Sequence, residues 1–108
     1  MSDDSARKIL QHSELTSFTP YTITDVEQIM HLVAAARKDG FASASQETRI
    51  GEVVAASAVI DGAGNPIGAI HVSTNVSSLK DQDIKTSIAP VAMNIANLIS
   101  RDIKNFWT

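Results

Sequence analysis

The sequence predicts an α+β fold: an antiparallel sheet covered by a helix at residues 24–39 and by a long C-terminal helix. Two observations carry this prediction. Residues 53–60 (VVAASAVI) and 67–73 (IGAIHVS) are apolar runs joined by a segment rich in Gly, Asn and Pro, a pattern typical of a β-hairpin. Nearer the C-terminus, aliphatic side chains recur at helical spacing.

Strand alternation predicts how the hairpin side chains divide between two faces. If Ile60 faces Ile67, one face carries six side chains: Val54, Ala56, Ala58, Ala69, His71 and Ser73. Because neither face is polar enough for open water, we expect both to be covered. The face with small side chains, one imidazole and one hydroxyl could line a cavity.

The helix at 24–39 has start and stop signals. Thr24 and Glu27 have the spacing of a capping box, and Gly40 follows the last turn, where a left-handed cap is typical. Residues 41–48 (FASASQET) alternate and predict a third strand. Three strands make a small sheet with two unpaired edges, which suggests missing strands or a partner.

The N-terminal residues 1–18 are expected to form a weakly ordered segment, since few apolar side chains occur there. Residues 19–108 are expected to form the folded domain. Residues 18–23 form a connector in which Phe18, Tyr21 and Ile23 are expected to anchor the chain to the core.

The C-terminal helix is expected to begin near Lys80 or Asp81, after a polar loop at 74–79. Pro90 lies inside this span and should bend the helix or split it after Ala89. The apolar set expected to face the core is Ile84, Ile88, Val91, Ala92, Ile95, Ile99 and Ile103.

Composition excludes several classes of protein. A chain of 108 residues suits one domain, and its net charge of −3 with scattered basic residues argues against nucleic-acid binding by this chain. No cysteine is present, so disulfides and thiolate metal sites are excluded. No apolar run approaches the length of a membrane span, and we expect a soluble cytoplasmic protein with no membrane partner.

Residues with catalytic or metal-binding chemistry are few. The three histidines, His12, His31 and His71, lack metal-site spacing, and no nucleophile elbow or phosphate-binding glycine loop occurs. We therefore expect no metal, no cofactor and no enzymatic activity. His71 differs from the other two histidines because strand alternation places it on the same face as Ser73, opposite Ala56. It is either a structural histidine bonded to a backbone carbonyl or a ligand contact.

From Thr19 onward, the order of motifs resembles the effector-binding domain of the IclR family of bacterial transcription regulators. The matching segments are TPYTITD at 19–25, AARKDGFA at 35–42, QE at 46–47 before Gly51, the two hairpin strands, and IAP at 88–90. The resemblance implies the C-terminal half of a GAF/profilin-like domain, without the winged helix-turn-helix through which such regulators bind DNA. The chain would be either an excised fragment or a natural short relative.

The resemblance also implies a ligand site and a function. It names pocket positions held here by Ala44, Val54, His71 and Ser73, of which only Ser73 keeps the residue type usual in the family. We expect Ala44, Val54, Ala56, His71 and Ser73 to bind a small organic acid or aromatic effector in a homo-oligomer. The alternatives are a dimerisation or scaffold module without ligand, and a small hydrolase or isomerase that uses His71.

Overall fold

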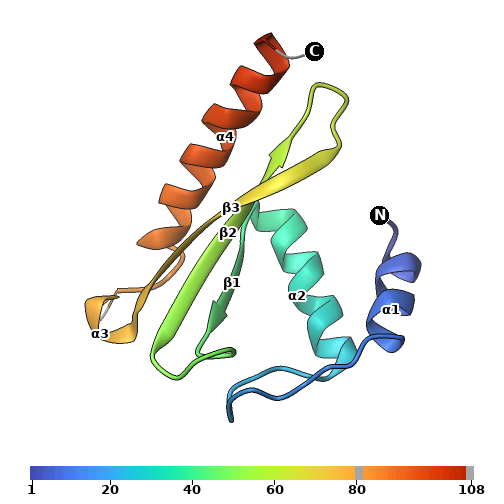
Figure 1. Ribbon diagram of the computed structural model, residues 1–108, viewed down its shortest axis with the longest axis vertical. Helices are drawn as coiled ribbons and strands as arrows, with labels where there is room; N and C mark the ends of the chain where they lie inside the picture. The colour runs from blue at the N-terminus through green and yellow to red at the C-terminus, as the bar shows by residue number, and fades with distance from the viewer. Residues whose placement is uncertain (80–81, 107–108) are drawn as a thin grey trace.

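A three-stranded antiparallel sheet with a long helix across it forms the centre of the computed structural model, which describes residues 1–79 and 82–106 (Figure 1). The strand order is β1-β2-β3. The elements in chain order are α1 (Asp3–Gln11), α2 (Val26–Asp39), β1 (Ala42–Ser45), β2 (Glu52–Ile60), β3 (Pro66–Asn75), α3 (Val76–Leu79) and α4 (Ile88–Phe106). The predicted α+β class is confirmed.

The predicted hairpin register is confirmed along most of β2 and β3. The cross-strand pairs are Ala58 with Ala69, Ala56 with His71, and Val54 with Ser73. At the turn the prediction is wrong, because the register shifts between Val59 and Ile60 and Ile60 pairs with Pro66 instead of Ile67. The Asp61 carboxylate accepts two backbone N–H bonds of 2.9 Å inside this turn, which stabilises the tight connection.

Helix α2 begins two residues later than expected. Asp25 is its N-cap, and the Asp25 carboxylate accepts a 2.9 Å hydrogen bond from the Gln28 backbone N–H. The predicted capping box of Thr24 and Glu27 is therefore wrong. A carboxylate next to Thr24 takes the capping role, and the Glu27 side chain pairs with Arg7 instead.

The C-terminal end of α2 is tied to the sheet. Gly40 has a φ of +83°, which confirms the predicted left-handed cap. The buried Ser57 hydroxyl of β2 donates a 2.9 Å hydrogen bond to the Gly40 carbonyl oxygen. Helix α2 thus leads into β1 at a fixed position.

Helix α4 covers one face of the sheet only. It lies across β2 and β3 (Figure 1). The buried β2 side chains Val53 and Ala55 belong to one apolar cluster with Ile88 and Ala89 of α4. Three alanines of α4 (Ala89, Ala92 and Ala96) are fully buried. Small side chains at these positions allow the helix and the sheet to approach closely. The expectation that both faces are covered is wrong, because side chains of the opposite face, such as Ala58, Ala69 and His71, are exposed.

The beginning of α4 explains its internal proline. Pro90 is the third residue of the helix, in the first turn, where backbone N–H groups have no intrahelical acceptor. The predicted bend or split after Ala89 is therefore wrong, and so is the predicted start near residue 80. Residues 80 and 81 themselves lie outside the described chain. The expected loop at 74–79 is also wrong, since it contains the end of β3 and α3.

Part of the predicted core stripe of α4 faces solvent. Val91 and Ile95 are 46% and 40% exposed, so their predicted place in the core is wrong. Leu98, which is not in the predicted set, is 50% exposed. The alanines take the sheet-facing positions, so these three larger side chains lie on a neighbouring arc of the helix. We refer to Val91, Ile95 and Leu98 as the outer stripe.

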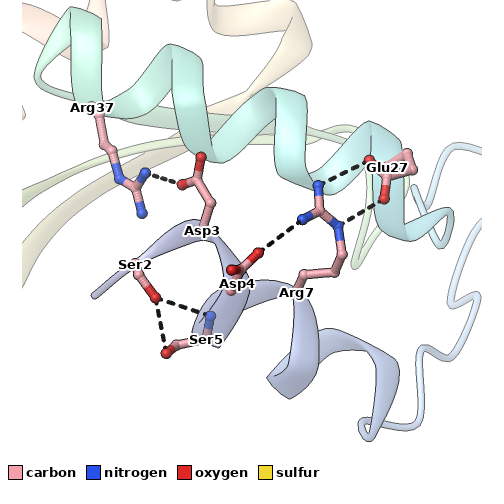
Figure 2. A network of polar contacts seen from close by, with 7 residues as sticks. All are labelled: Ser2, Asp3, Asp4, Ser5, Arg7, Glu27 and Arg37. Carbon is pink, nitrogen blue, oxygen red and sulfur yellow. Dashed lines mark hydrogen bonds and ion pairs between the residues drawn. The ribbon is translucent and has the colours of Figure 1, made fainter.

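Helix α1 is fastened to α2 by ion pairs at the surface (Figure 2). The Arg7 guanidinium donates to both Glu27 carboxylate oxygens, at 2.9 and 3.3 Å. Arg37 of α2 pairs with Asp3 and donates a 3.0 Å hydrogen bond to the Met1 carbonyl oxygen. Arg7 lowers the pKa of Glu27, mainly through the side-chain hydrogen bond.

None of the helices in the described residues combines the length and the apolar character needed to cross a bilayer.

Close packing of α4 predicts the effect of enlarging one of its alanines. Ala92→Leu should lower the free energy of unfolding by about 1–3 kcal/mol, because the added atoms have no room against the sheet. Urea unfolding measures this change. Ala35→Leu, at an exposed position of α2, is the matched control and should change the stability by less than about 0.5 kcal/mol. Equal effects for both variants would contradict the packing described here.

The Arg7–Glu27 pair predicts a pH-dependent docking of α1. Glu27→Gln should reduce the hydrogen-exchange protection of the α1 amides at neutral pH, because it removes the carboxylate that Arg7 binds. The folded-state pKa of Glu27 is depressed, so its contribution exists above the ordinary carboxyl pKa. This contribution is lost as the pH falls through the depressed value, where parent and variant should converge. Glu14→Gln is the control, and equal protection in all three proteins at neutral pH would disprove this role of the pair.

Candidate functional site

The five predicted ligand-binding residues lie together on the face of the sheet that α4 leaves open. Ala44 of β1, Val54 of β2 and Ser73 of β3 form one cross-strand row. Ala56 and His71 form the next row, since they are direct partners in the hairpin. Neighbouring strands are about 4.8 Å apart, so the five side chains fall within a single small area. We call this area the open face.

The open face combines an apolar floor with two polar groups. Ala44, Val54 and Ala56 are half-buried, whereas His71 and Ser73 are exposed. Neither the imidazole nor the hydroxyl forms a hydrogen bond with another residue of the described chain. Of the two interpretations of His71, the structure does not support the one in which it bonds a backbone carbonyl. Both polar groups are free to contact a ligand.

The open face is a surface and not an enclosed cavity. Two hollows in the described residues lie elsewhere. One of about 440 Å³ is lined by Asn94, Asn97, Leu98 and Arg101 of α4, and one of about 330 Å³ by Ile23, Gln28, His31 and Leu32. A ligand on the open face of this chain alone would therefore stay in contact with solvent on one side.

Two threonines of the connector hold the loop that follows β1. The Thr19 hydroxyl donates a 2.5 Å hydrogen bond to the Gln46 carbonyl oxygen, and the Thr22 hydroxyl donates to the Glu47 carbonyl oxygen. The Ile23 backbone N–H donates a 3.1 Å bond to the Glu47 carboxylate. We call this group of contacts the threonine latch. Thr19 is only 8% exposed, so its hydroxyl depends on these partners.

The latch replaces the hydrophobic anchor expected for the connector. Phe18 and Tyr21 are 69% and 56% exposed, so their predicted anchoring role is wrong, whereas Ile23 is half-buried as expected. The threonine-rich pattern was visible in the sequence as part of the family resemblance. Its acceptors, the carbonyl groups of Gln46 and Glu47, could not be located without the fold.

The loop held by the latch adjoins the open face. Gln46 has a φ of +59°, and its side-chain oxygen accepts a 3.1 Å hydrogen bond from the Gly51 backbone N–H. The Gly51 carbonyl oxygen in turn accepts a 2.7 Å bond from the Val76 backbone N–H, just beyond β3. The loop is thus bonded at both ends next to the row that contains Val54 and Ser73. Its shape sets one border of the open face.

Within residues 1–79 and 82–106, no group of three or more His, Asp or Glu side chains is arranged to hold a metal ion.

The fold is that of the C-terminal domain of a bacterial transcription regulator. Residues 1–101 match the family model described as the C-terminal domain of the bacterial transcriptional regulator IclR. The chain therefore belongs to the IclR C-terminal family, which confirms the resemblance found in the sequence. Membership of a family of transcriptional regulators also agrees with the prediction that the chain is not an enzyme.

Characterised relatives are longer than this chain. It is 26% identical over 83 residues to the p-hydroxybenzoate hydroxylase transcriptional activator of Acinetobacter baylyi, covering 77% of this chain and 31% of that protein. Two solved structures have TM-scores of 0.82 to this chain. One is a double mutant of the Acinetobacter PobR inducer-binding domain in complex with 3-hydroxybenzoic acid (22% identity; 93% of this chain, 57% of that one). The other is the Thermotoga maritima IclR (25% identity; 95% of this chain, 41% of that one).

The threonine latch predicts a loss of stability when its buried hydroxyl is removed. Thr19→Val keeps the side-chain shape but leaves the Gln46 carbonyl without its donor, and should cost about 1–3 kcal/mol of unfolding free energy. Chemical denaturation measures this loss. Thr16→Val, at an exposed position of the same connector, is the control. A Thr19→Val protein as stable as the control would mean that the latch does not hold the loop.

Proposed function

We propose that this chain is the C-terminal part of a small-molecule sensing domain, and that its effector binds on the open face. The observation that carries the proposal is the placement of His71 and Ser73 beside Val54 on the face of the sheet opposite α4, where both polar side chains are exposed. Membership of a family of regulators supports the sensing role.

The residues of the open face favour a small aromatic or organic acid. Ala44, Val54 and Ala56 offer a nearly flat apolar floor of the kind that an aromatic ring can cover. The His71 imidazole and the Ser73 hydroxyl can each donate a hydrogen bond to a carboxylate or a phenolic oxygen. The relative whose inducer-binding domain holds 3-hydroxybenzoic acid supports the same class of ligand.

The effector would act by shifting a conformational equilibrium. It can do so only if it binds more tightly to one of two arrangements of the protein than to the other. In this proposal the chain acts in a homo-oligomer in the cytoplasm, without a membrane partner. DNA would be contacted by a domain other than these 108 residues.

A scaffold or dimerisation module without ligand is the second candidate function. The exposed outer stripe of α4 favours it, because three large apolar side chains in solvent suit a protein contact. Thermal melts against a panel of hydroxybenzoates and other organic acids separate the two functions. An effector at a hundredfold excess over its dissociation constant stabilises the protein by about 2.7 kcal/mol, whereas a pure scaffold shows no shift.

Removing the polar groups of the open face should weaken binding but not folding. His71→Ala and Ser73→Ala should each raise the dissociation constant for 3-hydroxybenzoate about tenfold, the equivalent of about 1.4 kcal/mol for one lost hydrogen bond. Isothermal titration calorimetry measures the affinity. Both residues are exposed, so stability should change by less than about 0.5 kcal/mol.

His31→Ala is the matched control, since His31 is an exposed histidine of α2 away from the open face. Its variant should bind as the parent does. If the His71 and Ser73 variants also bound as the parent does, the effector would not lie on the open face.

A further inference from the structure

The open face continues into a further row of polar side chains, at the ends of β2 and β3 away from their turn. Because side chains alternate along β2, Glu52 points to the same face as Val54. Burial agrees with this placement: Glu52 and Val54 are half-buried, whereas Val53 between them is buried on the α4 side. The cross-strand partner of Glu52 is Asn75 of β3. We call Glu52 and Asn75 the end row.

The backbone that carries the Glu52 side chain is fixed on both sides. Its N–H donates a 3.1 Å hydrogen bond to the Arg49 carbonyl oxygen, and its carbonyl oxygen accepts a 2.7 Å bond from the Gln46 N–H. The threonine latch holds Gln46 in turn. The Glu52 side chain therefore extends from a defined point at the border of the open face.

The Glu52 carboxylate has no partner of its own. Across residues 1–79 and 82–106, its oxygens form neither a hydrogen bond nor an ion pair. An ionised carboxylate is an acceptor only, so a donor from solvent or from a ligand has to satisfy these oxygens. Because the side chain is half-buried, its contact with solvent is restricted, and a ligand donor at this position would form a charge-assisted hydrogen bond.

The open face and the end row together are polarised along the strands. The His71 imidazole, two rows away from Glu52, can donate a hydrogen bond, whereas the Glu52 carboxylate can only accept one. Val54 and Ala56 form an apolar floor between these two ends. A face of this kind suits a ligand with an acid group at one end and a hydrogen-bond donor at the other.

The distance between the two ends suits a single aromatic ring. Same-face neighbours on a strand are about 6.6 Å apart and adjacent strands about 4.8 Å apart, so the Cα atoms of Glu52 and His71 are about 14 Å apart. In a benzoic acid with a para substituent, the outer oxygen atoms are about 6–7 Å apart at standard bond lengths. One hydrogen bond of about 2.8 Å at each end extends this span to about 12 Å. Side chains that lean slightly towards each other close the difference.

We propose that Glu52 is a specificity-determining residue of the open face, which accepts a hydrogen bond from a hydroxyl or amino group at the far end of an aromatic acid. The ligand class is then an aromatic monocarboxylic acid with a donor para to its carboxylate. The carboxylate lies towards His71, and the ring lies on Val54. This assignment rests on the proposed function, because it requires the effector to bind on the open face.

The same carboxylate discriminates against a second acid group. A ligand carboxylate next to Glu52 would place two like charges at hydrogen-bond distance, away from part of the solvent that screens them. A neutral donor in the same place meets an acceptor that is already charged. Glu52 therefore separates hydroxy acids and amino acids of the ring from dicarboxylic acids of the same size.

Three ligands that differ in one para group test this role: 4-hydroxybenzoate, benzoate and terephthalate, which carries a second carboxylate. Isothermal titration calorimetry measures their affinities. The parent chain should bind 4-hydroxybenzoate about tenfold more tightly than benzoate, the effect of one hydrogen bond to a charged group. Terephthalate should bind the parent at least about tenfold more weakly than 4-hydroxybenzoate.

Glu52→Gln keeps the size of the side chain and removes its charge. The variant should bind 4-hydroxybenzoate about three- to tenfold more weakly, bind benzoate as the parent does, and bind terephthalate more tightly, because an amide can donate to the second carboxylate. Glu14→Gln removes the same charge from an exposed position outside the sheet and should keep the selectivity of the parent. The ratio of two affinities measured on one protein does not depend on the fraction of that protein which is folded.

A Glu52→Gln protein that keeps the parent's selectivity would overturn this role of Glu52. If His71→Ala still weakened the binding of all three acids, the effector site on the open face would remain. A parent that binds the three acids equally would overturn the role of Glu52 in the same way. A parent that binds none of them would contradict the proposed function itself, and the assignment of Glu52 would fail with it.

Discussion

Close packing of one helix on one face of the sheet is the constraint on which the rest of this structure depends. Ala89, Ala92 and Ala96 are fully buried, so α4 approaches β2 and β3 without large side chains between them. The small side chains of the helix face the sheet, and larger ones, such as Ile95, are partly exposed to solvent. Side chains alternate between the two faces of a strand, and α4 covers one of these faces. The alternate side chains of β2 and β3 therefore point to the opposite face, where solvent or a ligand can contact them.

Polar contacts then fix the border of that available face. The Ser57 hydroxyl holds the end of α2, and the threonine latch holds the loop after β1. Both use side-chain hydroxyls to satisfy backbone carbonyls that no strand or helix pairs. The ion pairs between α1 and α2 are exposed and contribute less to the fold. Local hydrogen bonds therefore position the loop beside Val54 and Ser73, while apolar packing positions the strands.

Much of this arrangement follows from local sequence patterns. Alternation along the hairpin predicts that Val54, His71 and Ser73 share a face, because the side-chain period of a strand is fixed once one pair is known. The left-handed cap at Gly40 follows from glycine alone. Both features depend on short-range geometry, and both agree with the structure.

The N-cap of α2, the role of Pro90 and the sheet-facing side chains of α4 could not be predicted from local patterns. In each case two residues or two roles are compatible with the sequence, and contacts with distant residues select one of them. Asp25 displaces Thr24 as the N-cap because both are good caps and Arg7, distant in sequence, binds Glu27. Pro90 starts α4 instead of bending it, since the same residue suits a first turn and breaks an interior one. The alanines of α4 face the sheet, and Val91 and Ile95 do not, because small side chains let the helix pack closer to the strands than larger ones would.

NMR chemical-shift mapping of the labelled chain with 3-hydroxybenzoate tests the central claim directly. The account predicts shifts centred on Val54, His71 and Ser73, and shifts confined to the α4 hollow around Asn97 and Arg101 would contradict it.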